Sequence, residues 1–592
     1  MKRFCALAVV LLSLTPAIGS AQSHTAPAEQ GLSGQSNPAR GKSAERRATS
    51  ITGRVVGDSA QPVSNATIRV LEAGKLMTMW RTTNTDGEGR FRVEDLTRGL
   101  YFVQPNAPGY VADDEVAQQK LRRPGDNVTI TLVKGGVITG TVTDSAGEPK
   151  VAIRIRALRV RDKEGRAVPR RVAAESQTDD RGTYRIYGMQ TGSYVIQAND
   201  REPYYGVGTF GDEVPTYYPS STIDTATPVS VRAGEEITGI DIRYRGEQGH
   251  AVSGAFSGAD LPGTNNRGAY LILTHDPGNL EEAQTYAGMN GRGASFAFYG
   301  VPDGDYYLYA RSVNNEKGEV SGSGRVRVKV KGADVTGLEI TLAPLGSIAG
   351  SVKLEPLREA DQKSKCESKS RTLSDEILIA ARRDEKENKS EPVSENWSRY
   401  QSAPTDKGEF TIINIEPGSY RLGYNLPGED LYVRSVTLPP PAPARPAIDV
   451  ARNSLAVKSG QRISGLSVTI SEGAAAIKGK VVAASEGAQL PAGLRLHLIP
   501  AEKESAEDTL RFAEVAAQSD GSFSIANIAP GRYFVLARLY PDEVSTNSAP
   551  RPVAWDGDGR KRLLREGEAA NVVVELQPCQ RITDYALRYK KQ

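Results

Sequence analysis

Five stretches of the chain carry an aromatic residue that is followed, ten residues later, by a tyrosine. The pairs are Phe91 and Tyr101, Tyr184 and Tyr194, Phe296 and Tyr306, Phe410 and Tyr420, and Phe523 and Tyr533. A fixed interval that recurs along 592 residues indicates an internal repeat. The chain is therefore expected to fold as a series of similar modules and not around a single core.

A short turn sequence precedes each aromatic residue, and the first of these, TDGEGRF (85–91), admits three interpretations. Asp86 and Glu88 could belong to a calcium loop, an acid/base pair or a simple turn. The third copy has Asn290 in place of Asp86, the shorter fifth copy has no counterpart of Glu88, and the ligand spacing of a calcium loop is missing. We interpret the stretch as a turn built on Asp and Gly, after which Phe91 and Val93 face a core.

Each copy also lies between two strand-like segments in which apolar and polar residues alternate, as in half-buried strands. The first segments are ITGRVV (51–56), ITGTVT (138–143), VSGAF (252–256), IAGSV (348–352) and IKGKVV (477–482). The last segments are NVTITLV (127–133), ITGIDIRY (237–244), VTGLEITL (335–342), ISGLSVTI (463–470) and NVVVEL (571–576). Each interval between them has the length of one β-sandwich.

The five pairs of first and last strand-like segments predict an all-β protein with five tandem modules. The expected parts are a signal peptide (1–21), a disordered linker (22–49), module 1 (50–134), module 2 (135–246), module 3 (249–344), module 4 with a charged insertion (345–472), module 5 (474–578) and a C-terminal tail (579–592). Because the linkers between modules are short, we expect an extended rod.

The first module resembles the carboxypeptidase regulatory-like domain, from ITGRVVGDSAQPVSNATIRV to the closing Ala107, Gly109 and Tyr110. The second module also matches well, the third and fourth match mainly at the turn and tyrosine motifs, and the fifth matches at both motifs and at its end strands. The resemblance implies a seven-stranded Greek-key β-sandwich of the prealbumin (transthyretin-like) kind, related to carbohydrate-binding-like and Cna-B-like sandwiches. The stretch L-x-x-G-x-Y also resembles a tyrosine corner. Such motifs specify a fold and no activity.

No catalytic residue, metal site or cofactor is expected. The histidines His24, His250, His275 and His497 lie apart, and none begins the H-x-x-E motif of a zinc carboxypeptidase. There is no G-x-S-x-G motif, and GVGTFG (206–211) is followed by Asp-Glu-Val-Pro instead of a helix. We interpret DGDG (556–559) as a surface turn. A Cna-B-like bond from Lys478 or Lys480 to Asn571 is a minor alternative.

Two groups of aromatic residues are candidates for ligand binding. Tyr204, Tyr205, Phe210, Tyr217 and Tyr218 lie within one loop of twenty residues (200–219), and Tyr307 and Tyr309 are expected to face outward from a strand. Such rings suit stacking on sugars, and Asp212 or Glu213 could bind hydroxyl groups. The alternative is that the loop aromatics close the core of module 2 or pack against module 3.

The N-terminus has the features of an export signal, with Lys2 and Arg3 before an apolar run and small residues before a cleavage site after Ala21. We therefore expect a secreted or periplasmic protein. The remaining cysteines, Cys366 and Cys579, could then form a disulfide.

With 74 basic and 71 acidic residues, no nucleic-acid partner is expected, and no later stretch is apolar enough to span a membrane. The function predicted is non-enzymatic binding of carbohydrate or a cell surface. The alternative is a structural spacer or a protein-docking or adhesion component of the envelope. The ligand and the oligomeric state are left open.

Overall fold

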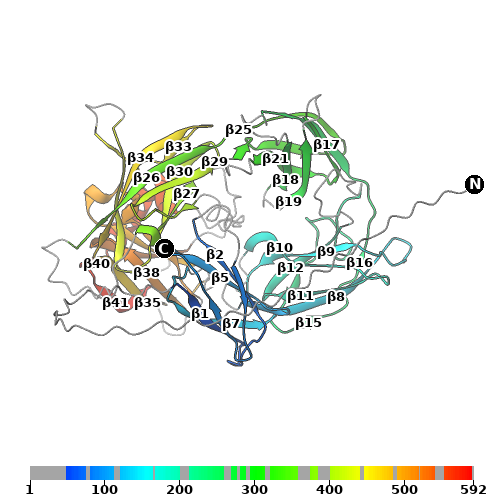
Figure 1. Ribbon diagram of the computed structural model, residues 1–592, viewed down its shortest axis with the longest axis horizontal. Coiled ribbons are helices and arrows are strands. Elements are labelled where there is room, and N and C mark those ends of the chain that lie inside the picture. Colours follow the sequence, from blue (N-terminus) through cyan, green and yellow to red (C-terminus); the bar gives the residue numbers. More distant parts are fainter. Residues whose placement is uncertain are drawn as a thin grey trace, which may run out of the picture. The chain divides into compact units, whose positions relative to one another are not determined.

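The computed structural model describes residues 49–74, 81–112, 121–163, 167–199, 213–258, 268–276, 281–288, 294–313, 320–357, 374–384, 401–440, 446–483, 490–491, 493–518, 520–539 and 552–589 (Figure 1). The described residues are mainly strands, which confirms the predicted all-β sandwich fold. The expected signal peptide and nearly all of the linker lie outside the described residues.

Module 1 contains two sheets. Its strands are β1 (Ile51–Val56), β2 (Thr67–Glu72), β3 (Arg81–Asn84), β4 (Arg90–Val93), β5 (Tyr101–Asn106), β6 (Tyr110–Ala112) and β7 (Asn127–Lys134). The sheet orders are β4-β1-β7-β6 and β3-β2-β5. β1 pairs antiparallel with β4 and parallel with β7. The first and last strands of the module are therefore neighbours, and this arrangement recurs in the later modules.

Modules 2 and 3 repeat the two-sheet plan. Module 2 has β8 (Gly136–Thr143), β9 (Arg154–Arg161), β10 (Ala167–Gln177), β11 (Thr183–Met189), β12 (Gly192–Asn199), β13 (Thr216–Tyr217), β14 (Val229–Val231), β15 (Glu236–Ile237) and β16 (Ile242–Arg243). Module 3 has β17 (His250–Ser257), β18 (Gly268–His275), β19 (Glu281–Gly288), β20 (Ala294–Val301), β21 (Gly304–Val313), β22 (Val320–Gly322), β23 (Val326–Val330), β24 (Val335–Thr341) and β25 (Ala343–Pro344). β8 lies between β11 and β15, and β17 lies between β20 and β24.

Module 4 has a larger first sheet, in the order β29-β26-β34-β31-β32, and a second sheet in the order β28-β27-β30-β33. Its elements are β26 (Gly346–Glu355), η2 (Ser374–Glu376), β27 (Leu378–Arg383), β28 (Gln401–Ser402), β29 (Glu409–Ile415), β30 (Gly418–Asn425), β31 (Leu431–Leu438), β32 (Ile448–Asp449), β33 (Leu455–Val457) and β34 (Arg462–Glu472). β31 pairs along the outer edge of the last strand, β34.

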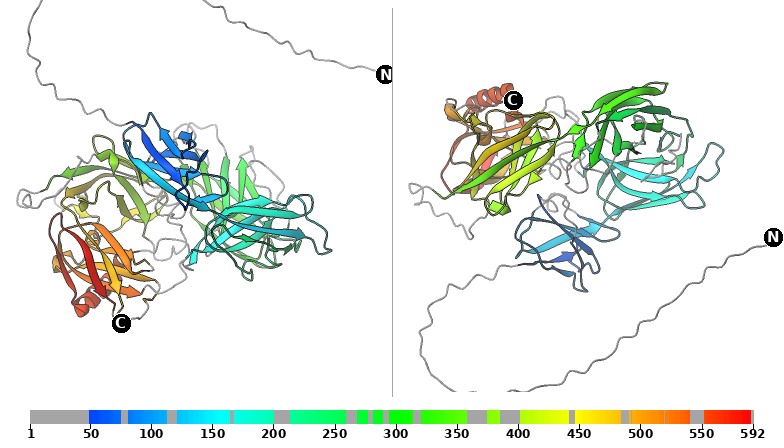
Figure 2. Two further views of the ribbon diagram at one scale, coloured as in Figure 1. Left: turned by 90° about the horizontal axis from the view of Figure 1, so that it is seen from below. Right: turned by 45° about the horizontal axis from the view of Figure 1, so that its top comes forward.

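Module 5 combines two sheets with the one α-helix among the described residues (Figure 2). Its elements are β35 (Ala475–Val482), β36 (Leu494–Pro500), η3 (Lys503–Ser505), η4 (Thr509–Arg511), β37 (Ala513–Ala516), β38 (Ser522–Ile528), β39 (Gly531–Leu539), η5 (Val553–Trp555), α3 (Gly557–Ala570), β40 (Val573–Leu576) and β41 (Arg581–Arg588). The sheet orders are β38-β35-β41 and β37-β36-β39-β40.

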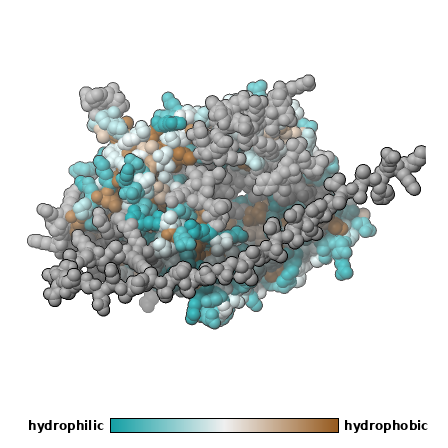
Figure 3. Space-filling model, in the orientation of Figure 1, coloured by the Kyte–Doolittle hydropathy of each residue, from teal (hydrophilic) through white to brown (hydrophobic). Residues whose placement is uncertain are grey.

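Five large hydrophobic clusters lie in the described residues, one within each expected module. In module 1, for example, Ile51 and Phe91 of one sheet pack with Ile68 and Val103 of the other. We use the predicted module limits as the working division, with module 5 extended to include β41. On the face drawn in Figure 3, apolar side chains are scattered among polar ones, as expected when the apolar residues are mostly inside.

The glycine shared by the first strands lies where the parallel last strand comes close. A Cβ atom at Gly53 would lie 2.2 Å from the backbone oxygen of Val128, and one at Gly479 would lie 1.9 Å from that of Tyr585. The corresponding distances are 2.1 Å for Gly140 and Ile240, 2.0 Å for Gly254 and Leu338, and 2.2 Å for Gly350 and Leu466. Any side chain at these positions would force the two strands apart.

The tyrosine corner implied by the resemblance is present in all five copies. Each tyrosine hydroxyl donates a hydrogen bond to the backbone oxygen four residues earlier. The distances are 2.8 Å for Tyr101 and Thr97, 2.6 Å for Tyr194 and Gln190, 2.8 Å for Tyr306 and Pro302, 2.8 Å for Tyr420 and Glu416, and 2.7 Å for Tyr533 and Ala529. The fixed sequence interval thus reflects one repeated structural contact.

A second repeated feature was not predicted. The residue four positions after each aromatic has a positive φ angle: 57° at Asp95, 73° at Gly188, 62° at Gly300, 62° at Asn414 and 59° at Asn527. In modules 2, 3, 4 and 5 the strand register shifts close to this residue, as in a β-bulge. The signal was present in the sequence, because only Asp, Asn and Gly occur at this position and these residues tolerate positive φ best.

Two expectations about module 5 are wrong. The segment NVVVEL does not contain its last strand: β40 pairs with β39, and β41 pairs parallel with the first strand, β35. The expected tail (579–592) therefore contains the strand that completes the module. The DGDG turn (556–559) is also wrong, because Asp556 caps α3 by accepting a 2.9 Å hydrogen bond from the backbone nitrogen of Gly559.

Contacts also join parts of the chain that are far apart in the sequence. Arg98 in module 1 forms an ion pair with Asp375 in module 4. Arg123 Nη2 donates a 2.7 Å hydrogen bond to the backbone oxygen of Pro427. The expected rod, in which each module contacts only its neighbours in sequence, would not make these contacts.

Candidate binding sites

Two of the predicted loop aromatics pack inside module 2. The side chain of Tyr217 is 3% exposed, and its hydroxyl accepts a 2.8 Å hydrogen bond from Gln197 Nε2. Tyr217 belongs to a small cluster with Leu158 and Val195, whereas Tyr218 is half-buried against the main core of the module. These positions fit the packing alternative, since little of either ring is free for a ligand. Tyr204, Tyr205 and Phe210 lie outside the described residues.

Tyr307 and Tyr309 alternate along β21 with the buried residues Tyr306 and Leu308, as the sequence pattern predicts. Both outward rings lie under guanidinium groups. Arg327 lies over Tyr307, 5.6 Å from the ring centroid, and its Nε donates a 3.1 Å hydrogen bond to the tyrosine hydroxyl. Arg325 and Arg311 lie 5.3 Å and 5.6 Å from the centroid of Tyr309. These faces are therefore partly covered by cation–π contacts.

The junction of modules 3 and 4 contains a buried carboxylate. Glu416 is 7% exposed and accepts hydrogen bonds from Arg311 (2.6 Å) and Arg383 (3.2 Å). Burial raises the pKa of Glu416, but the charges of Arg311, Arg383 and Arg325 outweigh it and hold the pKa below its usual value. This arrangement links the two modules, and both oxygens of the carboxylate accept a hydrogen bond from an arginine.

Modules 4 and 5 are joined by buried polar contacts. Arg421 of module 4 is 7% exposed and donates hydrogen bonds to Thr509 Oγ1 (3.4 Å) and to the backbone oxygen of Trp555 (3.5 Å), both in module 5. Asn527 Nδ2 lies 2.6 Å from the backbone oxygen of Gly428 and 2.7 Å from that of Leu431. Because Asn527 is the bulge residue of module 5, the repeated bulge itself contributes to this junction.

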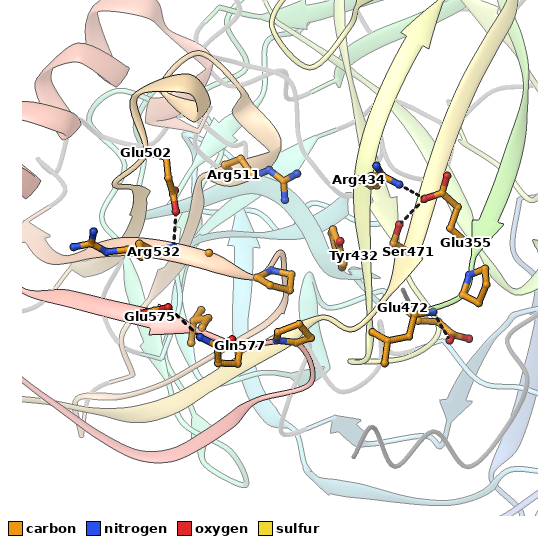
Figure 4. Close-up of a pocket in the computed structure, with 16 residues that line it drawn as sticks. Glu355, Tyr432, Arg434, Ser471, Glu472, Glu502, Arg511, Arg532, Glu575 and Gln577 are labelled. Atoms are coloured by element: carbon orange, nitrogen blue, oxygen red, sulfur yellow. Dashed lines mark hydrogen bonds and ion pairs between the residues drawn. The ribbon is translucent and has the colours of Figure 1, made fainter. Parts of the chain in front are cut away.

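A polar cleft of about 500 Å³ lies between modules 4 and 5 (Figure 4). Its size falls within the range of roughly 300–1,000 Å³ typical of small-ligand pockets. Module 4 supplies the ends of β26 and β34 and the outward side chains of β31. Module 5 supplies η4, the turn of its tyrosine corner and the end of β40. The charged and aromatic lining residues are Glu355, Tyr432, Arg434, Glu472, Glu502, Arg511, Arg532 and Glu575.

Many polar groups of the cleft wall are held in place by one another. Glu355 forms an ion pair with Arg434 and accepts a 3.3 Å hydrogen bond from Ser471. Across the cleft, the carboxylate of Glu502 accepts a 2.9 Å hydrogen bond from the backbone nitrogen of Arg532. In Figure 4 these two sets of side chains lie on opposite sides of the cleft. The cleft therefore has a preformed polar lining.

Arg511 and Tyr432 lie between the two sides of the cleft (Figure 4). The guanidinium carbon of Arg511 is 5.9 Å from the ring centroid of Tyr432, and its Nε is 3.5 Å from Asp508. Burial raises the pKa of Tyr533 to about 12, so the hydroxyl of this corner tyrosine stays protonated at neutral pH. The sequence analysis missed the cleft, because its residues come from seven separate segments of two modules.

The described residues contain no group of three or more His, Cys, Asp or Glu side chains that could hold a metal ion. His497 is buried, and burial followed by the charges of Arg538 and Arg495 lowers its pKa to about 3. No helix of the described part is both long and apolar enough to cross a membrane.

The sequence suggested two covalent links, a disulfide between Cys366 and Cys579 and a bond from Lys478 or Lys480 to Asn571. Cys579 is disulfide-bonded, but Cys366 lies outside the described residues, so their pairing stays a prediction. Lys480 forms a 3.2 Å ion pair with Asp520, and Lys478 lies 3.9 Å from Glu429. Asn571 ends α3 in a left-handed conformation. These positions give no support to a bond from either lysine to Asn571.

Residues 50–133 match the family model of the carboxypeptidase regulatory-like domain. This match confirms the resemblance for module 1 and covers less than half of the chain. No curated protein matches the sequence.

Solved structures of surface proteins give weaker similarities. The TIE protein of Bacillus anthracis is 15% identical over 50% of this chain and 51% of its own, with a TM-score of 0.13. The minor pilin GBS52 of Streptococcus agalactiae is 12% identical over 33% of this chain and 96% of its own, with a TM-score of 0.18. The major pilin subunit BcpA of Bacillus cereus is 11% identical over 50% and 99%, with a TM-score of 0.12. The chain thus spans about half of the TIE protein, and TM-scores this low carry no functional argument.

Proposed function

We propose that the chain is an exported, non-catalytic binding protein that recognises carbohydrate at a cell surface. The observation that carries this proposal is the preformed polar cleft between modules 4 and 5. It has the size of a small-ligand site, it contains an aromatic ring, and its polar groups are fixed by internal hydrogen bonds. A fixed polar lining of this kind supports binding, because little ordering of side chains is needed when a ligand enters.

Export is the second part of the proposal. It rests on the basic start and apolar run of residues 1–21 and on the use of cysteine in a disulfide at Cys579. N-terminal sequencing of the protein recovered outside the cytoplasm should begin at Gln22. An uncleaved N-terminus in the cytoplasmic fraction would contradict export.

The direct test of binding is a pull-down of the mature protein (22–592) with a panel of insoluble polysaccharides and cell-wall fractions. Retention that soluble sugar releases would support carbohydrate recognition. If no member of the panel retains the protein, the carbohydrate proposal fails.

The second candidate function is a spacer or protein-docking component of the envelope. The buried Glu416 with its two arginine partners favours this candidate, because it fixes module 3 against module 4 without forming a ligand site. A single protein partner that co-purifies with the chain, and that sugar does not displace, would favour docking over carbohydrate binding.

A further inference from the structure

We infer that the cleft between modules 4 and 5 binds an uncharged saccharide, with Tyr432 and Arg511 as its main contacts. This inference rests on the proposed carbohydrate-binding function and specifies the site and the ligand class. The described lining residues all belong to modules 4 and 5 and not to the predicted aromatic loop.

The charges of the cleft favour a neutral ligand. Its lining contains four glutamates and three arginines. Arg434 is already paired with Glu355, and Arg511 lies near Asp508. The acidic side chains outnumber the basic ones by one, so a polyanion meets no uncompensated field of opposite sign in this site. An anionic ligand would therefore lose its hydration without a matching electrostatic gain.

The hydrogen-bonding groups of the cleft suit hydroxyl groups. Guanidinium groups only donate hydrogen bonds, and carboxylates only accept them. Both kinds are present on each side of the cleft: Arg434 with Glu355 in module 4, and Arg532 with Glu502 in module 5. A sugar hydroxyl donates and accepts, so adjacent hydroxyls of one ring can use both kinds together. A purely apolar ligand would leave these groups without water or a partner.

Tyr432 provides the apolar surface that a sugar ring also needs. It is half-buried on β31 and points into the cleft (Figure 4). Arg511 is at the outer limit of a cation–π contact with its ring, at 5.9 Å. The ion pair with Asp508 holds the guanidinium beside the ring of Tyr432, so that a sugar stacked on the ring would have its hydroxyl groups within reach of Arg511.

The corner turns of the modules take part in different contacts. The corner residues Arg98 of module 1 and Glu416 of module 4 are engaged in ion pairs with other modules. The corner turn of module 5, Pro530–Gly531–Arg532, lines the cleft instead.

The test uses the mature chain and isothermal titration with soluble hexasaccharides: cellohexaose, xylohexaose, mannohexaose and chitohexaose as neutral probes, and hexagalacturonate as the anionic one. The neutral sugar that binds the wild-type protein should bind at least tenfold more weakly to Tyr432→Ala and to Arg511→Ala. Tyr432→Phe keeps the ring and should bind within about threefold of the wild type. Melting temperatures show whether each variant is folded.

Two exposed residues serve as matched controls. Tyr187 is 56% exposed in module 2, and the side chain of Arg92 is 60% exposed in module 1. Tyr187→Ala and Arg92→Ala should bind like the wild type.

Three results would overturn the inference. If a neutral sugar binds and both cleft variants bind it equally well, carbohydrate recognition stands but lies elsewhere in the chain. If hexagalacturonate is the only probe that binds, the site prefers anionic ligands and the inference of a neutral ligand is wrong. If no probe binds and the polysaccharide panel also fails, the proposed function itself is wrong.

Discussion

The hydroxyl of Tyr420 donates a 2.8 Å hydrogen bond to the backbone oxygen of Glu416, whose carboxylate binds Arg311 and Arg383. The corner that closes module 4 therefore also positions the residue that links it to module 3. The other corner turns have Thr97, Gln190, Pro302 and Ala529 at this position, so the carboxylate is particular to module 4. One repeated contact thus serves both the fold of a module and the junction between two modules.

Replacing Glu416 with Gln should destabilise the protein by about 3 kcal/mol at pH 7, because breaking a buried ion pair leaves its arginine partners uncompensated. The folded-state pKa of Glu416 lies below its unfolded value, so its stabilising contribution is complete above pH 4.5 and is lost as the pH falls through the folded pKa. Calorimetric unfolding should therefore show a difference in the free energy of unfolding between wild type and variant that becomes smaller toward pH 3. The exposed Glu409→Gln is the control. A difference in unfolding free energy that is the same at pH 3 as at pH 7 would contradict the lowered pKa of Glu416.

Module 1 offers a matched pair of glycines. Gly53→Ala places a Cβ 2.2 Å from a backbone oxygen, whereas Gly87→Ala meets no atom within 4 Å. The first change should lower the free energy of unfolding by about 2–3 kcal/mol, and the second should change it little. Chemical denaturation of both variants provides the comparison. Equal stability of the two variants would mean that the first and last strands are not packed as closely as described.

Deletion of residues 581–592 removes β41 and keeps Cys579. Because β41 pairs with the first strand of module 5, the truncated protein should lose the cooperative unfolding of that module and expose its core to protease. Limited proteolysis followed by mass spectrometry would locate the cuts in module 5. If the truncated chain resists protease like the intact protein, residues 581–592 are a dispensable tail as the sequence first suggested.

His497 should make module 5 sensitive to mild acid. Burial, followed by two nearby arginines, lowers its folded pKa to about 3, whereas an unfolded histidine titrates near 6.5. The unfolded state therefore binds more protons as the pH falls below 6.5, and the module should lose about 1.5 kcal/mol of stability between pH 6.5 and pH 5. His497→Gln should lose this dependence. Thermal melts in which wild type and variant keep a constant difference over that pH range would contradict the burial of a neutral histidine.

Much of the fold was predictable because it depends on local sequence. The interval from Phe91 to Tyr101 spans a strand and the tyrosine corner that follows it, and a turn directly precedes it. Because all three depend on neighbouring residues, the same spacing occurs in every copy. The alternation around Tyr306 and Leu308 likewise assigned the buried face of β21 correctly.

The wrong predictions concern segments whose sequence pattern was ambiguous or lacked a residue that the other copies share. NVVVEL alternates like a last strand, whereas the true one, β41, has Asp584 where Gly239, Gly337 and Gly465 stand in other modules. Its ITDYALRY sequence still resembles ITGIDIRY of module 2 and could have been recognised. α3 was missed because Gly557, Gly559 and Gly567 weaken a helical pattern. The cleft depends on how modules 4 and 5 pack together, which no local pattern encodes.

The central claim, that the chain binds carbohydrate, is tested most directly by affinity electrophoresis of the mature protein in native gels that contain a soluble neutral or anionic polysaccharide. The account predicts retarded migration in at least one neutral gel, little retardation in polygalacturonate, and normal migration of Tyr432→Ala in the neutral gel. Migration of the wild-type protein that is unchanged in every gel would contradict it.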